Sequence, residues 1–72
     1  MVTIYSQPGC QPCRMTKKAL TRAGVDYTDI DVTQDAKALA YIKSLGYQAV
    51  PVVEANGEHW YGYNTDKLSS IK

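Results

Sequence analysis

Phenylalanine is absent from this chain, which also has only two cysteines, one histidine and one tryptophan in 72 residues. Two cysteines are too few for the disulfide framework of a small secreted domain. No apolar run approaches the roughly 18 residues of a membrane span, so we expect no membrane partner. Eight basic and seven acidic residues give a net charge of +1. This balance lacks the electrostatic footprint of a nucleic-acid-binding protein, and we expect no such partner.

The first residues, MVTIYSQPG, have neither the basic start nor the apolar core of a secretory signal. We therefore expect a cytoplasmic protein. In that reducing compartment, a close pair of cysteines is more often catalytic or metal-binding than structural. The length predicts one domain over residues 1–72, with a thin core.

The pattern of apolar residues predicts seven elements in the order β-α-β-α-β-β-α. We expect strands at 2–5, 27–32, 50–55 and 58–61, and helices over 11–23, from a cap at Thr33 to Gly46, and from a cap at Thr65 onward. Asn56-Gly57 is typical of a type I′ hairpin turn. A βαβ unit requires parallel strands and a hairpin requires antiparallel ones. The predicted fold class is therefore α/β, with a four-stranded mixed sheet and helices on its faces.

The only cysteines, Cys10 and Cys13, are two residues apart between the first predicted strand and the first predicted helix. In a βαβ context this spacing is typical of a thioredoxin-like redox motif. We expect Cys10 at the helix N-terminus, where free amide groups and the helix dipole stabilise a thiolate. Cys13 would lie deeper and resolve a mixed disulfide. Pro12 is tolerated in the first turn and stiffens the segment between the two sulfurs.

Two other interpretations of the cysteine pair remain open from the residues alone. A structural zinc site needs two further ligands, and His59 is the only other nitrogen candidate. A structural disulfide would close a very short loop and stabilise the fold little. Val50-Pro51 fits an ordinary proline at the start of a strand, and the dipeptide alone does not predict a cis bond.

Three segments, YSQPGCQPC, AVPVV and WYGYNTDKL, resemble the glutaredoxin branch of the thioredoxin fold, and more narrowly the NrdH-type redoxins. The resemblance covers nearly the whole chain. Its most specific part is a Trp-Ser-Gly-Phe-Arg-Pro-Asp-like segment, matched here by Trp60, Gly62, Tyr63 and Asp66. The chain departs from that pattern at Tyr61, Asn64 and Thr65, and it has Gln11-Pro12 where the family commonly has a hydrophobic residue followed by Gln.

The resemblance implies a thioredoxin fold with three helices and a cis bond before Pro51, beside the cysteines. Val50 and Pro51 would present backbone to an extended substrate segment, with Gln11 and Pro12 also facing the partner. We expect Trp60, Gly62, Tyr63 and Asp66 to be mainly structural and to join the last strand to the C-terminal helix.

The resemblance also implies a dithiol–disulfide oxidoreductase, with a redox-active Cys10–Cys13 disulfide and no bound cofactor or metal. Thioredoxin reductase would reduce it with electrons from NADPH, and it would donate them to the large subunit of class Ib ribonucleotide reductase. We expect a monomer that docks through small apolar contacts rather than by electrostatic steering, given its near-neutral charge and its many tyrosines.

Two alternative functions remain. A glutathione-dependent glutaredoxin typically carries an acidic pair after the last strand, whereas YGYNTD contains only Asp66. A non-enzymatic metal-binding or adaptor module would keep the cysteine pair without using it for electron transfer.

Overall fold

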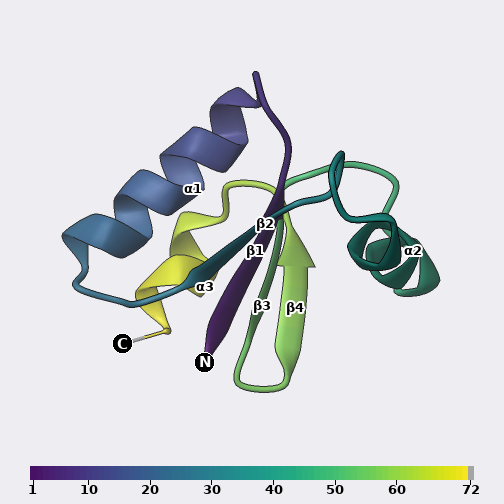
Figure 1. The fold of residues 1–72 in the computed structure, drawn as a ribbon. Coiled ribbons are helices and arrows are strands. Elements are labelled where there is room, and N and C mark those ends of the chain that lie inside the picture. The colour runs from purple at the N-terminus through teal and green to yellow at the C-terminus, as the bar shows by residue number, and fades with distance from the viewer. Residues whose placement is uncertain (72) are drawn as a thin grey trace.

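The computed structural model describes residues 1–71, which form four strands and three helices in the predicted order (Figure 1). The elements are β1 (Val2–Ser6), α1 (Gln11–Arg22), β2 (Thr28–Asp31), α2 (Ala36–Ser44), β3 (Val52–Ala55), β4 (Glu58–Tyr61) and α3 (Thr65–Ser69). Within this described part, none of the helices has the length and apolarity needed to span a bilayer.

The four strands form one mixed sheet in the order β2-β1-β3-β4. β1 pairs with β2 in parallel and with β3 antiparallel, and β3 pairs antiparallel with β4. The mixed sheet expected from the sequence is therefore confirmed. Because β1 and β3 run in opposite directions, with Tyr5 opposite Val52, the end of β1 and the start of β3 meet at one end of the sheet. The segment with the cysteines follows β1 there, and Pro51 precedes β3.

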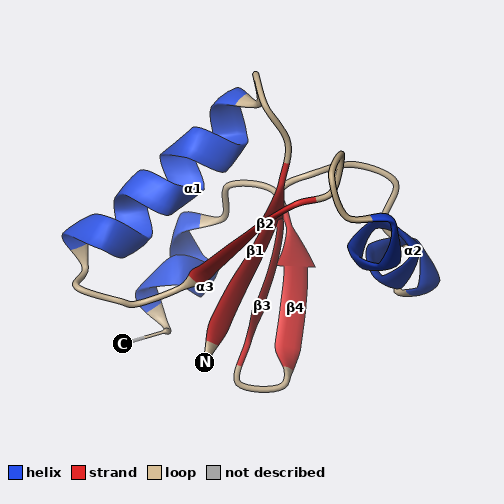
Figure 2. Ribbon diagram, viewed as in Figure 1, coloured by secondary structure: helices blue, strands red, loops and turns tan. Residues whose placement is uncertain are grey.

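Helices cover both faces of the sheet, with α1 and α3 on one side and α2 on the other (Figure 2). We call these the α1/α3 face and the α2 face. The buried cluster of the α1/α3 face contains Val2, Ile4, Leu20, Val53, Ala55, Trp60 and Leu68. The buried cluster of the α2 face contains Tyr5, Cys10, Cys13, Val32, Ala38, Ile42, Val50 and Val52. Both cysteines thus pack into the α2-face cluster, although they lie at the start of α1.

The prediction that Thr33 caps the second helix was wrong, because α2 begins three residues later. Asp35 is the N-cap, and its carboxylate accepts the N–H of Ala38 at 3.0 Å. Thr33 instead lies in a turn after β2, where its N–H and hydroxyl both donate to Oδ1 of Asp31, at 2.8 and 2.6 Å. Two residues suited to capping compete here, and the one bound to the preceding strand cannot also cap the helix.

The predicted cap of the last helix was also one residue too late. Asn64 is the N-cap of α3, its Oδ1 accepting the N–H of Lys67 at 3.1 Å, and Thr65 is the first helical residue. β3 begins at Val52 rather than at residue 50, and β2 is shorter than predicted. The hairpin turn is as expected: Asn56 and Gly57 have φ values of 53° and 83°, both positive as a type I′ turn requires.

Candidate active site

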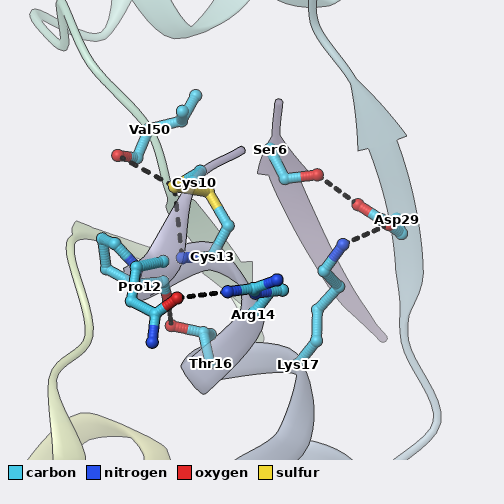
Figure 3. Close-up of a disulfide and its surroundings, with 10 residues drawn as sticks. Ser6, Cys10, Pro12, Cys13, Arg14, Thr16, Lys17, Asp29 and Val50 are labelled. Atoms are coloured by element: carbon cyan, nitrogen blue, oxygen red, sulfur yellow. Dashed lines mark hydrogen bonds and ion pairs between the residues drawn. A yellow bond between two sulfur atoms is a disulfide. The ribbon is translucent and has the colours of Figure 1, made fainter. Parts of the chain in front are cut away.

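Cys10 and Cys13 form a disulfide bond where the segment after β1 enters α1 (Figure 3). Cys10 is the N-cap of the helix, in an extended backbone conformation, and its Sγ accepts the N–H of Cys13 at 3.2 Å. Cys10 is 9% exposed and Cys13 only 1%. The predicted order of outer and inner cysteine therefore holds in the geometry, with a backbone amide directed at the outer sulfur.

A proline and two side-chain hydrogen bonds hold the first turn of α1 in place. Pro12 occupies a first-turn position, where a missing N–H breaks no helical hydrogen bond. Its carbonyl accepts the hydroxyl of the fully buried Thr16 at 2.8 Å. On the outer side, the guanidinium of Arg14 donates to the side-chain oxygen of Gln11. Gln11 and Pro12 are themselves exposed, so both are accessible to a partner that approaches Cys10.

The segment before β3 lies directly against the cysteines. The carbonyl oxygen of Val50 is 3.9 Å from Sγ of Cys10 (Figure 3). The Val50–Pro51 peptide bond is cis, the form implied by the resemblance. Pro51 is fully buried, and its carbonyl accepts the N–H of Gly62 at 2.8 Å. Residues some 40 positions away in sequence are thus brought beside the disulfide by the pairing of β1 with β3.

A groove of about 190 Å³ opens beside Val50, between α2 and the segments around the disulfide. Its walls combine aliphatic and amide side chains with one lysine and one tyrosine: Gln7, Val32, Leu39, Ile42, Lys43, Tyr47, Gln48, Ala49 and Val50. The groove can accept an apolar side chain beside Val50, whose carbonyl oxygen lies 3.9 Å from Sγ of Cys10.

Four residues were predicted to join the last strand to the C-terminal helix, and Asp66 lies as expected in the first turn of that helix. Trp60 is buried in the same cluster as Leu68 of α3. Gly62 has φ of +89°, which a side chain disfavours, and its N–H reaches the carbonyl of Pro51. Tyr63 and Asp66 are exposed and, within the described residues, make no hydrogen bond to the cysteines or to the Val50–Pro51 segment.

A polar network near the disulfide was not found from the sequence. The hydroxyl of buried Ser6 donates to Oδ1 of Asp29 at 2.6 Å, and Nζ of Lys17 lies 2.9 Å from Oδ2 (Figure 3). Partial burial raises the pKa of the Asp29 carboxyl, but the hydrogen bonds from Ser6 and Lys17 outweigh burial and hold that pKa below its ordinary value. The network joins α1, β1 and β2, and only the parallel pairing of the two strands brings its members together.

A second network lies on the α2 face. The carboxylate of Glu54 accepts the hydroxyl of Tyr41 at 2.5 Å and that of Tyr5 at 3.4 Å. The hydrogen bond to Glu54 raises the pKa of Tyr41 to about 12. Burial, followed by the charge of Glu54, raises the pKa of Tyr5.

The hydroxyl of Tyr47 lies 2.7 Å from Nδ1 of His59, and the two rings meet edge to face. His59 is exposed on β4 of the hairpin. Within residues 1–71, no group of three or more His, Cys, Asp or Glu side chains is arranged to hold a metal ion.

Comparison with known proteins identifies the family. A family model described as glutaredoxin matches residues 2–60. The chain is also 30% identical over 70 residues to the glutaredoxin-like protein NrdH of Escherichia coli (strain K12), covering 97% of this chain and 86% of the relative. The chain belongs to the glutaredoxin family, as an NrdH-type redoxin.

Solved structures place the redoxin in the thioredoxin fold. It superposes on the NrdH-redoxin of Escherichia coli with a TM-score of 0.95 and 30% identity, covering 99% of this chain and 93% of that one. That glutaredoxin-like protein is described as having a thioredoxin-like activity profile. The glutaredoxin of Archaeoglobus fulgidus matches with a TM-score of 0.86 and 32% identity, over 97% and 83% of the two chains.

A phage protein is also similar. The Gene 56 protein of Mycobacterium phage L5 is 40% identical over 72 residues, covering 97% of this chain and 70% of the relative. With its family, its fold and its Cys10–Cys13 disulfide, the redoxin is a thiol–disulfide oxidoreductase.

Proposed function

We propose that this redoxin is a single-domain, monomeric electron carrier of the cytoplasm. Thioredoxin reductase reduces it with electrons from NADPH, and it reduces the large subunit of class Ib ribonucleotide reductase. The observation that carries the proposal is the placement of Cys10 at the N-cap of α1, with the N–H of Cys13 directed at its sulfur and Cys13 enclosed beneath. The thioredoxin-like activity profile of the Escherichia coli relative supports the choice of reductant.

The first step is attack by Cys10. In the reduced protein, the amide of Cys13 and the helix N-terminus stabilise negative charge on Sγ of Cys10, and the thiolate is the nucleophile. It attacks one sulfur of the partner's disulfide. A bond forms between Cys10 and that sulfur, the partner's S–S bond breaks, and the released partner thiolate takes a proton from solvent. The product is a mixed disulfide between the two proteins.

Cys13 completes the exchange. Its thiol loses a proton, and the resulting thiolate attacks Sγ of Cys10. The bond between Cys10 and the partner breaks, and the second partner thiolate leaves and is protonated. Two electrons and two protons have then passed to the partner, and the redoxin holds its Cys10–Cys13 disulfide. Thioredoxin reductase restores the dithiol by the same exchange in reverse.

The groups on the two sides of Cys10 suit an extended partner segment. Gln11 and Pro12 are exposed on one side of Cys10, and Val50 and Pro51 lie on the other. We propose that the partner's backbone pairs with Val50, as in strand addition, and that one of its side chains enters the groove of about 190 Å³. Such small contacts suit a carrier that must release its partner, since weak redox encounters bury under ~1,200 Å².

Two cysteine variants test the roles of the sulfurs. Cys13→Ser should accumulate a mixed disulfide with a partner, because nothing remains to resolve it. Cys10→Ser should lose turnover completely. Mass spectrometry of the trapped species identifies the linked cysteine. Accumulation of a mixed disulfide through Cys13 in the Cys10→Ser protein would reverse the assignment.

Two parallel assays test the circuit. The first compares the rate of NADPH oxidation with thioredoxin reductase against the rate of reduction by glutathione. The second measures deoxyribonucleotide formation by the class Ib enzyme with the redoxin as the only reductant. Efficient reduction by glutathione, with none by thioredoxin reductase, would instead assign this protein to the glutathione-dependent glutaredoxins.

A further inference from the structure

The charges of the redoxin are distributed unevenly along the chain. The first 25 residues contain no acidic residue, and their four basic residues, Arg14, Lys17, Lys18 and Arg22, all belong to α1. All seven acidic residues follow later in the chain. Although the net charge is only +1, α1 is strongly basic. The expectation that electrostatic steering is unimportant considered the net charge and not this distribution.

Three of these cations form a row on the outside of α1. Arg14, Lys18 and Arg22 are spaced four residues apart, so they lie on one side of the helix over about 12 Å of its length. We call this row the basic stripe. All three side chains are exposed, and none forms an ion pair within residues 1–71. Lys17 differs, since it is bound to Asp29.

The core does not require the stripe, because the helix packs through Cys13, Thr16 and Leu20. Arg14 is bonded to Gln11, and Arg22 lies in the last turn, where a cation favours the helix dipole. Like charges four residues apart nevertheless repel each other along a helix. A row of exposed cations with no carboxylate bound to it points to an anion outside the molecule.

The stripe is continuous with the redox site. Arg14 directly follows Cys13, and Figure 3 shows Arg14 on the first turns of α1 below the disulfide. Beside the stripe is a hollow of about 350 Å³ lined by Arg14, Lys17, Lys18, Thr21 and Tyr27. Cationic side chains around an aromatic ring match a segment that carries carboxylates next to an apolar residue.

We propose that the basic stripe docks an acidic segment of the protein whose disulfide the redoxin reduces. This inference rests on the proposed function, because it requires exchange with a protein disulfide. A protein segment fits better than another polyanion, since any partner whose sulfur reaches Cys10 must lie against the start of α1. The carboxylates then orient the partner before the sulfurs react, and the contact is sensitive to salt.

Two synthetic peptides with the same internal disulfide test the proposal. One carries four Asp or Glu residues beside the disulfide, and the other carries Asn or Gln at those positions. The second-order rate of reduction by the dithiol redoxin is measured for each. At about 0.01 M salt, where the Debye length is ~30 Å, we expect the acidic peptide to react about tenfold faster. At about 1 M salt, where the Debye length is ~3 Å, the preference should vanish.

A pair of charge-matched variants locates the effect. Lys18→Gln/Arg22→Gln should lower the preference at low salt to below about twofold. Lys37→Gln/Lys67→Gln removes the same charge from α2 and α3 and should keep the preference of the wild type. Arg14 is left intact, so the surroundings of the cysteines do not change. All four substituted positions are on the surface, and circular dichroism with urea titration verifies that both variants fold.

The outcomes separate the two proposals. Equal rates for the two peptides with the wild type, or a preference that persists in Lys18→Gln/Arg22→Gln, would overturn the docking proposal and leave the exchange chemistry standing. Reduction of neither peptide would overturn the proposed function and the docking proposal with it. Binding of a DNA duplex or of phosphatidylserine vesicles that depends on Lys18 and Arg22, without faster reduction of the acidic peptide, would also overturn it.

Discussion

The two faces of the sheet differ in the chemistry of what they bury (Figure 2). The α1/α3 face buries an apolar cluster that includes Leu20, Trp60 and Leu68 but neither cysteine. The α2 face combines an apolar cluster with both cysteines and with the polar contacts of Glu54. An apolar cluster stabilises the fold through the burial of its side chains, and its close packing tolerates few substitutions. The α2 face is the face that borders the disulfide, and its Tyr41–Glu54 contact is exposed to solvent.

This comparison implies that stability and redox exchange can be altered separately. Substitutions in the α1/α3 cluster should lower the free energy of unfolding and leave the exchange rate per folded molecule unchanged. Substitutions near the Val50–Pro51 segment should affect exchange more than their cost in stability suggests.

The largest effect on stability is expected from Trp60→Ala. Removing this buried indole from the α1/α3 cluster should lower the free energy of unfolding by about 3–5 kcal/mol. Urea titration of the oxidised protein measures the loss. Tyr61→Ala, one residue later on the same strand and exposed, is the control and should change stability by less than about 0.5 kcal/mol. If Trp60→Ala kept its stability but lost exchange with the reductase, Trp60 would belong to the partner-binding surface instead.

A smaller loss of stability is expected from Gly62→Ala. At φ of +89° an alanine is strained by about 1–2 kcal/mol, and no atom lies within 4 Å of the added Cβ, so the cost comes from the backbone alone. Gly57→Ala is a matched control, with φ of +83° at the tip of the hairpin. Both variants should lose similar stability. Only Gly62→Ala should slow thiol exchange, because a backbone shift that relieves the strain at residue 62 moves the N–H that binds the carbonyl of Pro51. Equal exchange rates in the two variants would show that this hydrogen bond does not position the Pro51 segment.

Tyr41→Phe removes one polar contact of the α2 face and should cost less stability than Gly62→Ala. The folded pKa of Tyr41, about 12, lies above its ordinary value of 10.0, so its contribution to stability is complete below pH 10 and is lost as the pH rises toward 12. The difference in the free energy of unfolding between wild type and variant, measured by urea titration at pH 7 and at several pH values above 10, should therefore shrink as the pH rises toward 12. Tyr61→Phe removes an exposed hydroxyl and serves as the control. If the difference in the free energy of unfolding between wild type and Tyr41→Phe stayed constant with pH, the hydrogen bond to Glu54 would be excluded as its source.

The smallest effect is expected from Asp29→Asn, at the rim of the α1/α3 face. Its side chain is 39% exposed, so the ion pair with Lys17 contributes only about 0.5 kcal/mol. The folded pKa of Asp29 lies below its ordinary 3.8, so this contribution is present above pH 4 and is lost as the pH falls through the folded pKa. Thermal unfolding of both proteins between pH 7 and pH 2 measures the difference. A difference that grew on acidification would contradict the role assigned to Asp29.

The sequence predicted best those features that depend on nearby residues. The element order, the hairpin turn at Asn56-Gly57 and the helix start at Cys10 each follow from a few adjacent positions. The exact caps did not, because two residues that suit capping stand close together in both cases. Asp35 and Asn64 cap the helices, while Thr33 binds Asp31 and Thr65 enters its helix.

The contacts that surround the disulfide required the three-dimensional arrangement. The bond from Gly62 to Pro51 and that from Ser6 to Asp29 join segments whose proximity depends on strand order and register. No local pattern marks these pairs. The cis form of the Val50–Pro51 bond came from the resemblance to a family and not from the dipeptide.

The strand order makes β2 and β4 the edge strands of the sheet, and one side of each backbone is unpaired. Another molecule can add a strand to such an edge and begin an aggregate. β2 has four residues and carries Asp29 and Asp31, so two copies of it repel each other at neutral pH. β4 carries one acidic residue, Glu58, followed by His59, Trp60 and Tyr61, so charge protects it less than β2. At high protein concentration, we therefore expect self-association to begin at the edge strand β4.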